Sequence, residues 1–550
     1  MVHSGSSKIY RPIWLQLKNG LATISFLREQ IRNGNTLKQP SANPSPNDDF
    51  RPVLTPIYIK EYLRRRDITM AHVDCLQTDY SSLQEIIGNG VRVFALSTTW
   101  LLSLAQAEHI RHAARQLRKL APHVPIIIGG MGARKAFRTR ELLDDGTLVD
   151  SLLSNSFLRF LPVGWRNLIL MKQLTKHLLM IDAGADHLID ALAISDSSEA
   201  TLAAIVRRCQ EGKDFRDLPG LAIPTSRGYH FSNGQTDPVD LNAEWIDWTR
   251  YSHLLRGHPA PIRIGAGCPY RCGFCDFPGL QDLQLRSAES LVKELRSLAS
   301  ALPAPRQVNF TDDNLGVTRR RLVEFTRTLI QAKLDIQWTA FLRIDIIDSE
   351  VASLLKDSGC KQCWLGIESG DPDVLANMDK RLDPDQALRG IQVLDKAGIE
   401  TISHFVVGYP GECTRSIDRT AQFISAIPSG TSAHTIHRYK LFRLIVAPLS
   451  PLAGPEQRQR FDLHGIGEHW RHKTMNARAA RFAMRDIFRR VKGPSHLYFE
   501  TLPEEWPRDA IRKVIELRDD VQKAILRKDL TPGISDLLQV VRQVETSRTS

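Results

Sequence analysis

The chain has 550 residues, enough for two to four domains, and its apolar share of 42% and charged share of 24% are those of ordinary globular proteins, which excludes wholesale disorder, collagen and a continuous coiled coil. No stretch reaches the roughly 18 apolar residues of a membrane-spanning helix, and residues 14–27 lack the cleavage site of a signal peptide. The net charge of +12 comes from basic residues scattered along the chain, so it does not by itself indicate nucleic-acid binding.

The first part of the chain predicts an α/β domain after an N-terminal extension. Residues 1–50 end in a stretch rich in Pro, Ser and Asn, which is typical of a linker. Between residues 51 and 235, apolar β-branched runs alternate with helical patterns, which predicts a doubly wound, Rossmann-like parallel sheet. We expect helices at 58–66, 82–87, 104–120 and 199–210, strands at 69–73, 91–96, 124–128 and 191–195, and turns at 217–220 and 228–234.

A linker at residues 236–258 leads to a second alternating region at residues 259–445. We expect strands at 262–266, 307–310, 336–341, 362–366 and 401–407, separated by helices at 288–302, 319–332, 350–357, 384–397 and 414–427. Five or six βα units in a row predict a partial (β/α)6 barrel, whose functional residues lie at the carboxyl ends of the strands. Residues 446–550 are expected to form a mainly helical C-terminal region.

Three cysteines give the strongest chemical signal of the sequence. Cys268, Cys272 and Cys275 lie in a glycine-containing loop just after the first strand of the second region. Three thiolates within eight residues can each bind a different iron of a cubane cluster and leave the fourth iron free. A zinc site would need a fourth ligand, and the nearest pair, Cys360 and Cys363, falls in a different βα unit and is interpreted as buried and inert. The eight unequally spaced cysteines favour a metal site in a reducing, cytoplasmic compartment over a disulfide framework.

The cysteine loop resembles the CxxxCxxC signature of radical S-adenosylmethionine (SAM) enzymes. The likeness extends over residues 260–425 through the loops at 310–314, 338–343, 366–370 and 408–412. It implies a [4Fe-4S] cluster whose free iron binds SAM and whose electron cleaves SAM to a 5′-deoxyadenosyl radical. In this resemblance carboxylates bind the ammonium or ribose, an arginine binds the methionine carboxylate, and glycine admits the adenine. The matching residues are Phe274, Asp312, Asp313, Arg343, Glu368, Ser369 and Gly408.

The first domain is similar to the cobalamin-binding domain of one radical SAM subfamily. Three of its turns are expected at the carboxyl edge of the sheet, where doubly wound folds bind ligands. One departure concerns the axial histidine of related cobalamin domains, because residues 79–83 contain no histidine and His72 falls inside a predicted strand. We therefore expect either cobalamin without a protein axial ligand or a domain that has lost the cofactor. The candidate cobalamin residues are Ser97, Thr98, Thr99, Gly129, Gly130, Ser197 and Glu199.

The resemblance implies a cobalamin-dependent radical SAM methyltransferase. We expect it to act on an unactivated carbon, or a phosphinate, of a small-molecule or peptide precursor in secondary metabolism. Residues 470–475, together with Arg438, Tyr439 and Arg443, are expected to cover the barrel mouth and select the substrate. A flavodoxin- or ferredoxin-type protein would supply electrons, and neither a membrane nor a nucleic acid is an expected partner.

Other functions fit the same motifs. A radical SAM cyclase, oxidase or rearrangement enzyme shares the two-domain layout. An RNA-modifying methylthiotransferase usually has a second cysteine triad upstream, whereas residues 1–260 contain only Cys75 and Cys209. A non-catalytic iron–sulfur or zinc scaffold would not need the carboxylates Asp313 and Glu368 at strand ends.

Overall fold

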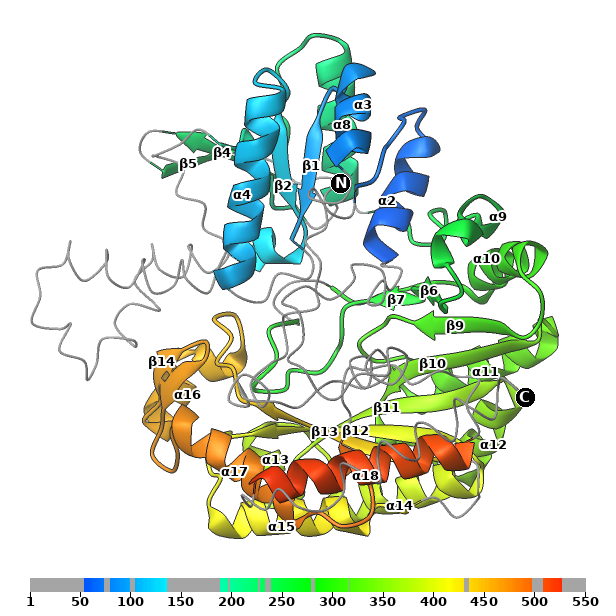
Figure 1. Ribbon diagram of the computed structural model, residues 1–550, viewed down its shortest axis with the longest axis vertical. Coiled ribbons are helices and arrows are strands. Elements are labelled where there is room, and N and C mark those ends of the chain that lie inside the picture. The colour runs from blue at the N-terminus through cyan, green and yellow to red at the C-terminus, as the bar shows by residue number, and fades with distance from the viewer. Residues whose placement is uncertain are drawn as a thin grey trace, which may run out of the picture. The chain divides into compact units, whose positions relative to one another are not determined.

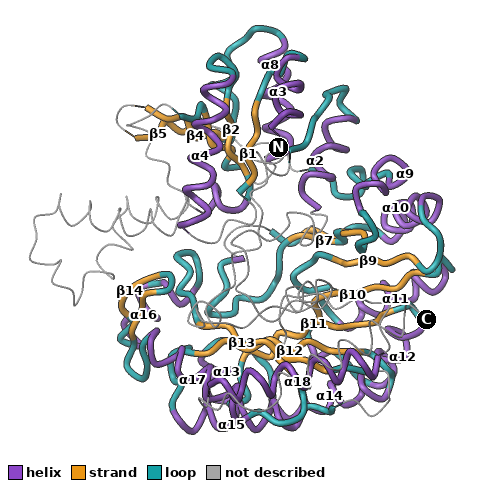
Figure 2. Tube along the Cα trace, in the orientation of Figure 1, coloured by secondary structure: helices purple, strands orange, loops and turns teal. Residues whose placement is uncertain are grey.

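A computed structural model describes residues 54–73, 80–98, 104–135, 188–195, 198–225, 228–232, 239–277, 282–315, 317–429, 435–496 and 508–526. The chain divides into two compact units (Figures 1 and 2). Unit 1 contains Pro52–Pro303 and Ile445–Trp470, and unit 2 contains Ala304–Leu444 and Arg471–Ser550. Among the residues that the structure describes, no helix combines the length and apolar character that a bilayer crossing needs.

Unit 1 contains a five-stranded mixed sheet. Strands β1 (Phe94–Ser97), β2 (Ile126–Gly129) and β3 (Ala191–Ala193) pair in parallel, and β4 (Leu221–Thr225) and β5 (Gly228–Phe231) continue the sheet antiparallel. Three of the four predicted strands are therefore present and parallel, but the sheet is mixed rather than fully parallel, and two other predictions were wrong. The turn predicted after residue 228 is a strand, and residues 69–73 contain only one bridged residue, Val73. Strand β4 escaped the sequence pattern because it contains Pro224, which is tolerated near the edge of a sheet.

Helices cover both faces of this sheet. Side chains alternate along a strand, so Ile126 and Ile128 join the apolar cluster of helix α4 (Leu104–Leu120), while Ile127 joins that of α8 (Ser198–Gln210). Helix α2 (Leu54–Arg64) packs on α8 through Tyr62 and Leu63, and α3 (Tyr80–Gly88) adds Leu83 to the α4 side. This two-sided burial explains the continuous apolar runs of the strands.

The rest of unit 1 includes the cysteine loop, which lies between β7 and β8 in the chain. It contains α9 (Trp248–Tyr251), β6 (Ala260–Ile262), the antiparallel pair β7 (Gly265–Ala266) and β8 (Gln284–Leu285), α10 (Ala288–Ala301), α16 (Pro455–Phe461), and the pair β14 (His464–Ile466) and β15 (His469–Arg471). Buried polar contacts link these elements. Glu61 of α2 accepts a hydrogen bond from the Tyr251 hydroxyl at 3.0 Å, and Glu294 of α10 accepts one from Trp248 Nε1 at 3.1 Å.

Unit 2 is built on parallel strands in the order β16 (Ser495–His496), β13 (His437–Arg443), β12 (Glu400–Val407), β11 (Cys360–Glu368), β10 (Ile336–Leu342) and β9 (Arg306–Phe310). Helices α11 (Arg319–Ala332), α12 (Ser349–Asp357), α14 (Pro384–Lys396) and α15 (Thr414–Ala426) connect successive strands, with a short α13 (Pro372–Asn377) after β11. Figure 1 shows these helices beside the strands, with α17 (Ala477–Arg490) and α18 (Arg508–Leu526) completing the layer. The predicted parallel α/β sheet is confirmed, and its closure into a partial barrel stays a prediction.

Side chains along strand β10 alternate between the two faces of the unit 2 sheet. Trp338, Ala340 and Leu342 are buried, whereas the intervening Thr339 and Phe341 are partly exposed and belong to the opposite face. Local capping fixes the helices that follow the strands: Asp348 caps α12, and Asp383, followed by Pro384, caps α14. Tyr439, which we expected to cover the barrel mouth together with Arg438 and Arg443, is instead fully buried on strand β13.

Candidate active site

The three cysteines form a compact loop in unit 1 that is anchored through its backbone. The Cys275 amide donates to the Cys272 carbonyl at 2.9 Å, and the Leu452 amide donates to the Gly273 carbonyl at 2.8 Å. Cys272 is buried, Cys268 and Cys275 are half-buried, and none of the three forms a disulfide. Phe274 lies half-buried in the same turn. The backbone therefore holds three thiols on one short loop.

The donor set suits an iron–sulfur cluster. All three donors are thiols that form no disulfide, and thiolates are the ligands that such clusters use. Within the described part of the chain, no three His, Cys, Asp or Glu side chains form a group that could hold one metal ion. In a cubane cluster each of three cysteines binds a different iron, so its ligands need not converge on one point.

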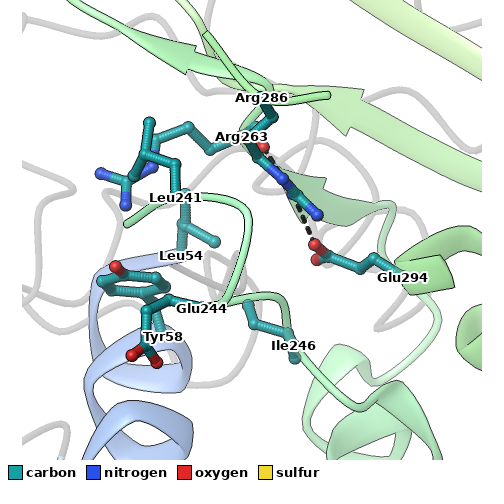
Figure 3. Close-up of a pocket in the computed structure, with 8 residues that line it drawn as sticks. All are labelled: Leu54, Tyr58, Leu241, Glu244, Ile246, Arg263, Arg286 and Glu294. Atoms are coloured by element: carbon teal, nitrogen blue, oxygen red, sulfur yellow. Dashed lines mark hydrogen bonds and ion pairs between the residues drawn. The ribbon is translucent and has the colours of Figure 1, made fainter. Parts of the chain in front are cut away.

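A small pocket lies in unit 1 near strand β6, a few residues before the cysteine loop (Figure 3). Its buried floor is the ion pair between Arg286 and Glu294, whose charged atoms are 2.6 Å apart, while Arg263 lies over the Tyr58 ring at 4.5 Å. The space for water-sized molecules is about 10 Å³, close to that of one water molecule. The pocket is therefore too small for a cofactor.

Two loops at the carboxyl ends of β9 and β10 carry candidate ligand-binding residues. Asp312 is half-buried and Asp313 is exposed. The adjoining Asn314, which the sequence interpretation did not select, is 8% exposed, and neither atom of its amide has a hydrogen-bond partner. A buried amide without hydrogen-bond partners destabilises the folded state unless a ligand or a water molecule binds to it. Asn314 is therefore a further candidate for binding a polar ligand at this loop.

Arg343 corrects one expectation about this edge. Its guanidinium is buried and already engaged, with Nε 2.9 Å from Asp345 Oδ1 and Nη2 2.9 Å from Asp345 Oδ2. Nη2 also donates to the Lys380 carbonyl at 3.0 Å. The Arg343 guanidinium, which we expected to bind a methionine carboxylate, therefore binds the loop that precedes α14 instead.

Strand β11 ends in a strained turn around Glu368. This residue has a φ of +71°, which is unfavourable for any residue with a Cβ. Its carboxylate is 3.1 Å from Lys380 Nζ, and both side chains are buried. A Cβ on Gly366 would lie 2.5 Å from Glu368 Oε1 and 2.9 Å from Lys380 Nζ, so glycine leaves room for the ion pair in its present position. A strained backbone and a buried ion pair at the end of a strand are typical of a binding site.

Ser369 has a different role from the one expected. Its side chain is fully buried, its Oγ lies 3.3 Å from Thr420 Oγ1, and it accepts a hydrogen bond from the Asp371 amide at 3.1 Å. Ser369 therefore links the end of β11 to α15 and to the start of α13. It does not offer a free hydroxyl to a ligand.

The turn that follows β12 is held from two sides. Gly408 has a φ of +101°, and its amide donates to the side-chain oxygen Oε2 of Glu412. From the other side, His472 Nε2 donates to the Gly408 carbonyl at 3.0 Å, and Thr474 Oγ1 accepts from the Gly411 amide at 3.2 Å. Burial raises the pKa of Glu412 to about 8 and lowers that of His472. Both shifts favour the uncharged forms, and the segment predicted to cover the barrel mouth contacts this turn directly.

One face of the unit 2 sheet gathers aromatic and basic side chains. His404 stacks on Phe341 with ring centroids 5.4 Å apart, and Trp364 and Phe442 lie 5.9 and 5.6 Å from it. Lys440, next to His404 in the β12–β13 register, is buried. Burial lowers the pKa of Lys440 to about 7 and, with repulsion from Lys440, that of His404 to about 4. The sequence interpretation missed these residues because they occur inside strands.

The turns predicted to bind cobalamin lie in unit 1. Thr98 is fully buried, and its Oγ1 donates to the Gly129 carbonyl at 2.7 Å and accepts from the Ala133 amide at 2.9 Å. Thr98 therefore shapes the β2 turn and offers no free hydroxyl. Ser97 is buried at the end of β1, and Gly130 has a φ of +96°. Glu199 begins α8, whereas Thr99 and Ser197 lie outside the described residues.

Cys360 and Cys363 are fully buried on strand β11 of unit 2, with their sulfur atoms 3.7 Å apart. Burial raises the pKa of the Cys360 thiol well above its usual value. A buried thiol with a raised pKa is a poor metal ligand and a poor nucleophile. The interpretation of this pair as a structural part of the core is consistent with both observations.

The sequence of residues 262–424 matches the radical SAM superfamily. The chain is 25% identical over 261 residues to an uncharacterized methyltransferase of Pyrococcus horikoshii, and this match covers 45% of the chain and 55% of that protein. It is 24% identical over 248 residues to the anaerobic magnesium-protoporphyrin IX monomethyl ester cyclase of Rubrivivax gelatinosus, with 42% and 44% covered. The chain thus spans about half the length of these curated relatives.

A solved structure matches over nearly the whole chain. TsrM from Kitasatospora setae, a radical SAM methyltransferase with cobalamin and a [4Fe-4S] cluster bound, is similar with a TM-score of 0.57. The alignment covers 92% of this chain and 98% of that chain, at 14% identity. The two proteins share a fold, and at 14% identity the likeness shows the fold alone.

Proposed function

We propose that this chain, which carries a radical SAM domain at residues 262–424, is a cobalamin-dependent radical SAM methyltransferase that acts on a carbon, or a phosphinate, of a small-molecule or peptide substrate. The observation that carries the proposal is a short loop inside the matched domain with three cysteines that form no disulfide, Cys268, Cys272 and Cys275. The fold shared with TsrM and the methyltransferase relative support the choice of methyl transfer.

Each candidate residue has a stated task in this proposal. Cys268, Cys272 and Cys275 would hold the cluster, and Ser97, Gly129, Gly130 and Glu199 would line the cobalamin site, with Thr98 shaping it. When bound, the cluster would supply the electron that cleaves SAM, and cobalamin would carry the methyl group. The remaining SAM candidates are Phe274, Asp312, Asp313, Asn314, Glu368 and Gly408.

The chain's own residues would orient SAM. Asn314 offers a buried amide whose hydrogen bonds are unmet, so it can both donate to and accept from a polar ligand. The Glu368 carboxylate can accept from an ammonium or a hydroxyl while Lys380 balances its charge. The Gly408 turn is kept in shape by Glu412 and His472. Positioning of this kind is the protein's usual contribution when cofactors carry the chemistry.

Substrate choice would depend on the aromatic face formed by Phe341, Trp364, His404 and Phe442. Rings 5 to 6 Å apart can pack against a flat, conjugated group. The neutral His404 adds a nitrogen, Nδ1, that is buried without a hydrogen-bond partner. This face therefore favours a planar substrate that carries a hydrogen-bond donor.

The experiment that tests the function is product analysis with SAM bearing a deuterated methyl group. The full chain is purified without oxygen, reconstituted with iron, sulfide and hydroxocobalamin, and supplied with dithionite and SAM. Methyl transfer predicts S-adenosylhomocysteine and loss of the deuterated methyl from SAM, with 5′-deoxyadenosine where a hydrogen is abstracted. Cys272→Ala should abolish these products, whereas Cys209→Ala, which removes a cysteine outside the loop, should not.

A radical cyclase is the second candidate, favoured by the relative in Rubrivivax gelatinosus. A cyclase would form 5′-deoxyadenosine without S-adenosylhomocysteine, and the deuterated methyl would remain on methionine. The same product analysis therefore separates the two candidates.

A further inference from the structure

An ion pair joins the cysteine loop to the five-stranded sheet of unit 1. Asp276 follows Cys275 directly, and its Oδ2 lies 2.7 Å from Lys135 Nζ. The two side chains are 24% (Lys135) and 16% (Asp276) exposed, so water screens their charges less than it screens a surface pair. The contact thus places a positive and a negative charge together, one residue from a proposed cluster ligand.

The lysine is held in place by the end of the sheet. Lys135 is the last described residue of a helical segment that begins at residue 131, directly after Gly129 and Gly130. Thr98 fixes this segment, because its Oγ1 binds the Gly129 carbonyl and the Ala133 amide and its carbonyl accepts from the Gly132 amide at 3.2 Å. The contacts of Thr98 therefore hold the start of the segment that carries Lys135, and the ion pair links this segment to Asp276.

We propose that Lys135 and Asp276 are positioning residues that fix the cysteine loop against the sheet and set the reduction potential of its cluster by keeping the local charge near zero. The inference rests on the proposed function, since it needs a cluster at Cys268, Cys272 and Cys275. Net charge near an iron–sulfur cluster is one of the factors that set its potential. An uncompensated carboxylate beside Cys275 would oppose the entry of an electron, and an uncompensated ammonium would favour it.

The test is a redox titration of the reconstituted full chain. One electron passes from dithionite to the oxidised cluster, and electron paramagnetic resonance measures the fraction reduced at each potential. Lys135→Met should make the potential more negative than in the wild type, and Asp276→Asn should make it less negative. The double variant should return close to the wild type, and Lys135→Arg, which keeps the charge, should leave the potential unchanged.

Control variants distinguish an effect of charge on the reduction potential from an effect of damage to the fold. Lys213→Met breaks an exposed pair of similar length, with Lys213 Nζ 2.7 Å from Glu211 Oε2, in the same unit and should not move the potential. Iron content and circular dichroism are measured for every variant. A merely structural pair would give shifts in one direction, or loss of iron in both single variants that the double variant does not restore.

The two possible failures are distinguishable. Equal or same-direction shifts in the single variants, with a cluster present in the wild type, would overturn this inference and leave the proposed function standing. A wild-type protein that takes up no cluster would overturn the proposed function, and this inference with it.

Discussion

The Nε2 atom of His472 lies 3.0 Å from the carbonyl oxygen of Gly408 and donates a hydrogen bond to it. The other ring nitrogen, Nδ1, accepts from the amides of Thr474 and Met475 at 3.3 and 3.2 Å. These bonds select the neutral tautomer with its proton on Nε2. Burial lowers the pKa of the ring, which also favours the neutral form. The segment after β15 thereby holds the turn at the end of β12.

Replacing His472 should weaken nucleoside binding at this turn. His472→Phe keeps a ring but removes the donor to Gly408, so we expect about a tenfold loss of affinity for S-adenosylhomocysteine, equivalent to a hydrogen bond of about 1.4 kcal/mol. Isothermal titration calorimetry on the reconstituted protein measures it. Lys473→Met, at the neighbouring exposed position, is the matched control. Unchanged affinity in His472→Phe would remove this residue from the site.

The buried Glu412 should make stability depend on pH. Its pKa is raised to about 8, first by burial, and returns to about 4.5 on unfolding. Between these values only the unfolded state loses the proton, so the free energy of unfolding should fall as pH rises from 5 to 8. Glu412→Gln lacks this titration. The difference in the free energy of unfolding between the wild type and Glu412→Gln should therefore change by on the order of 3 kcal/mol over that range.

Urea unfolding of the wild type and Glu412→Gln at pH 5, 6.5 and 8 measures this difference. A constant difference across the three pH values would show that Glu412 is ionised in the folded protein. The hydrogen bonds that it accepts from the turn would then involve a carboxylate.

Lys440 should show the opposite pH dependence. Burial lowers its pKa from 10.5 to about 7, so above pH 7 the folded state is uncharged here while the unfolded state keeps its proton. The free energy of unfolding should therefore rise from pH 7 toward pH 10. Lys440→Met should be more stable than the wild type at pH 7, with a smaller advantage at pH 10. Lys361→Met, an exposed lysine on β11, should show no such trend, and a parallel trend in both variants would contradict the assignment.

Loss of one loop cysteine should remove the cluster without unfolding the protein. Cys272→Ala should lose the iron and the absorbance of the cluster, while circular dichroism keeps its helix and strand signal, because the two sheets have their own apolar cores. Cys413→Ala, an exposed cysteine outside the loop, is the control and should retain the iron. Collapse of the secondary structure in Cys272→Ala would favour a structural metal scaffold instead.

The sequence predicted most elements whose pattern is local. Helix α11 was predicted with its observed ends, because apolar periodicity and the capping Thr318 coincide there. Strand β13 was missed, because it mixes charged and aromatic residues that only its neighbours in the sheet explain. Strands that depend on pairing partners far along the chain carry a weaker local signal.

The same limit applies to the candidate site. Gly408 and Glu368 could be selected because they follow strands in recognisable loops, and both lie at strained or positive-φ positions. The engagement of Arg343 by Asp345, the unmet amide of Asn314 and the contact of His472 with Gly408 all depend on side-chain geometry that spacing alone does not encode. Residue type indicated the chemistry, and packing decided which groups stay available.

Metal analysis of the reconstituted wild-type protein tests the central claim most directly. The chain is purified without oxygen, supplied with iron, sulfide and hydroxocobalamin, desalted, and analysed for iron, cobalt and ultraviolet–visible absorbance. The account predicts about four irons and one cobalt per chain. Iron without cobalt would contradict the cobalamin mechanism and leave a radical SAM domain joined to an α/β domain with another task.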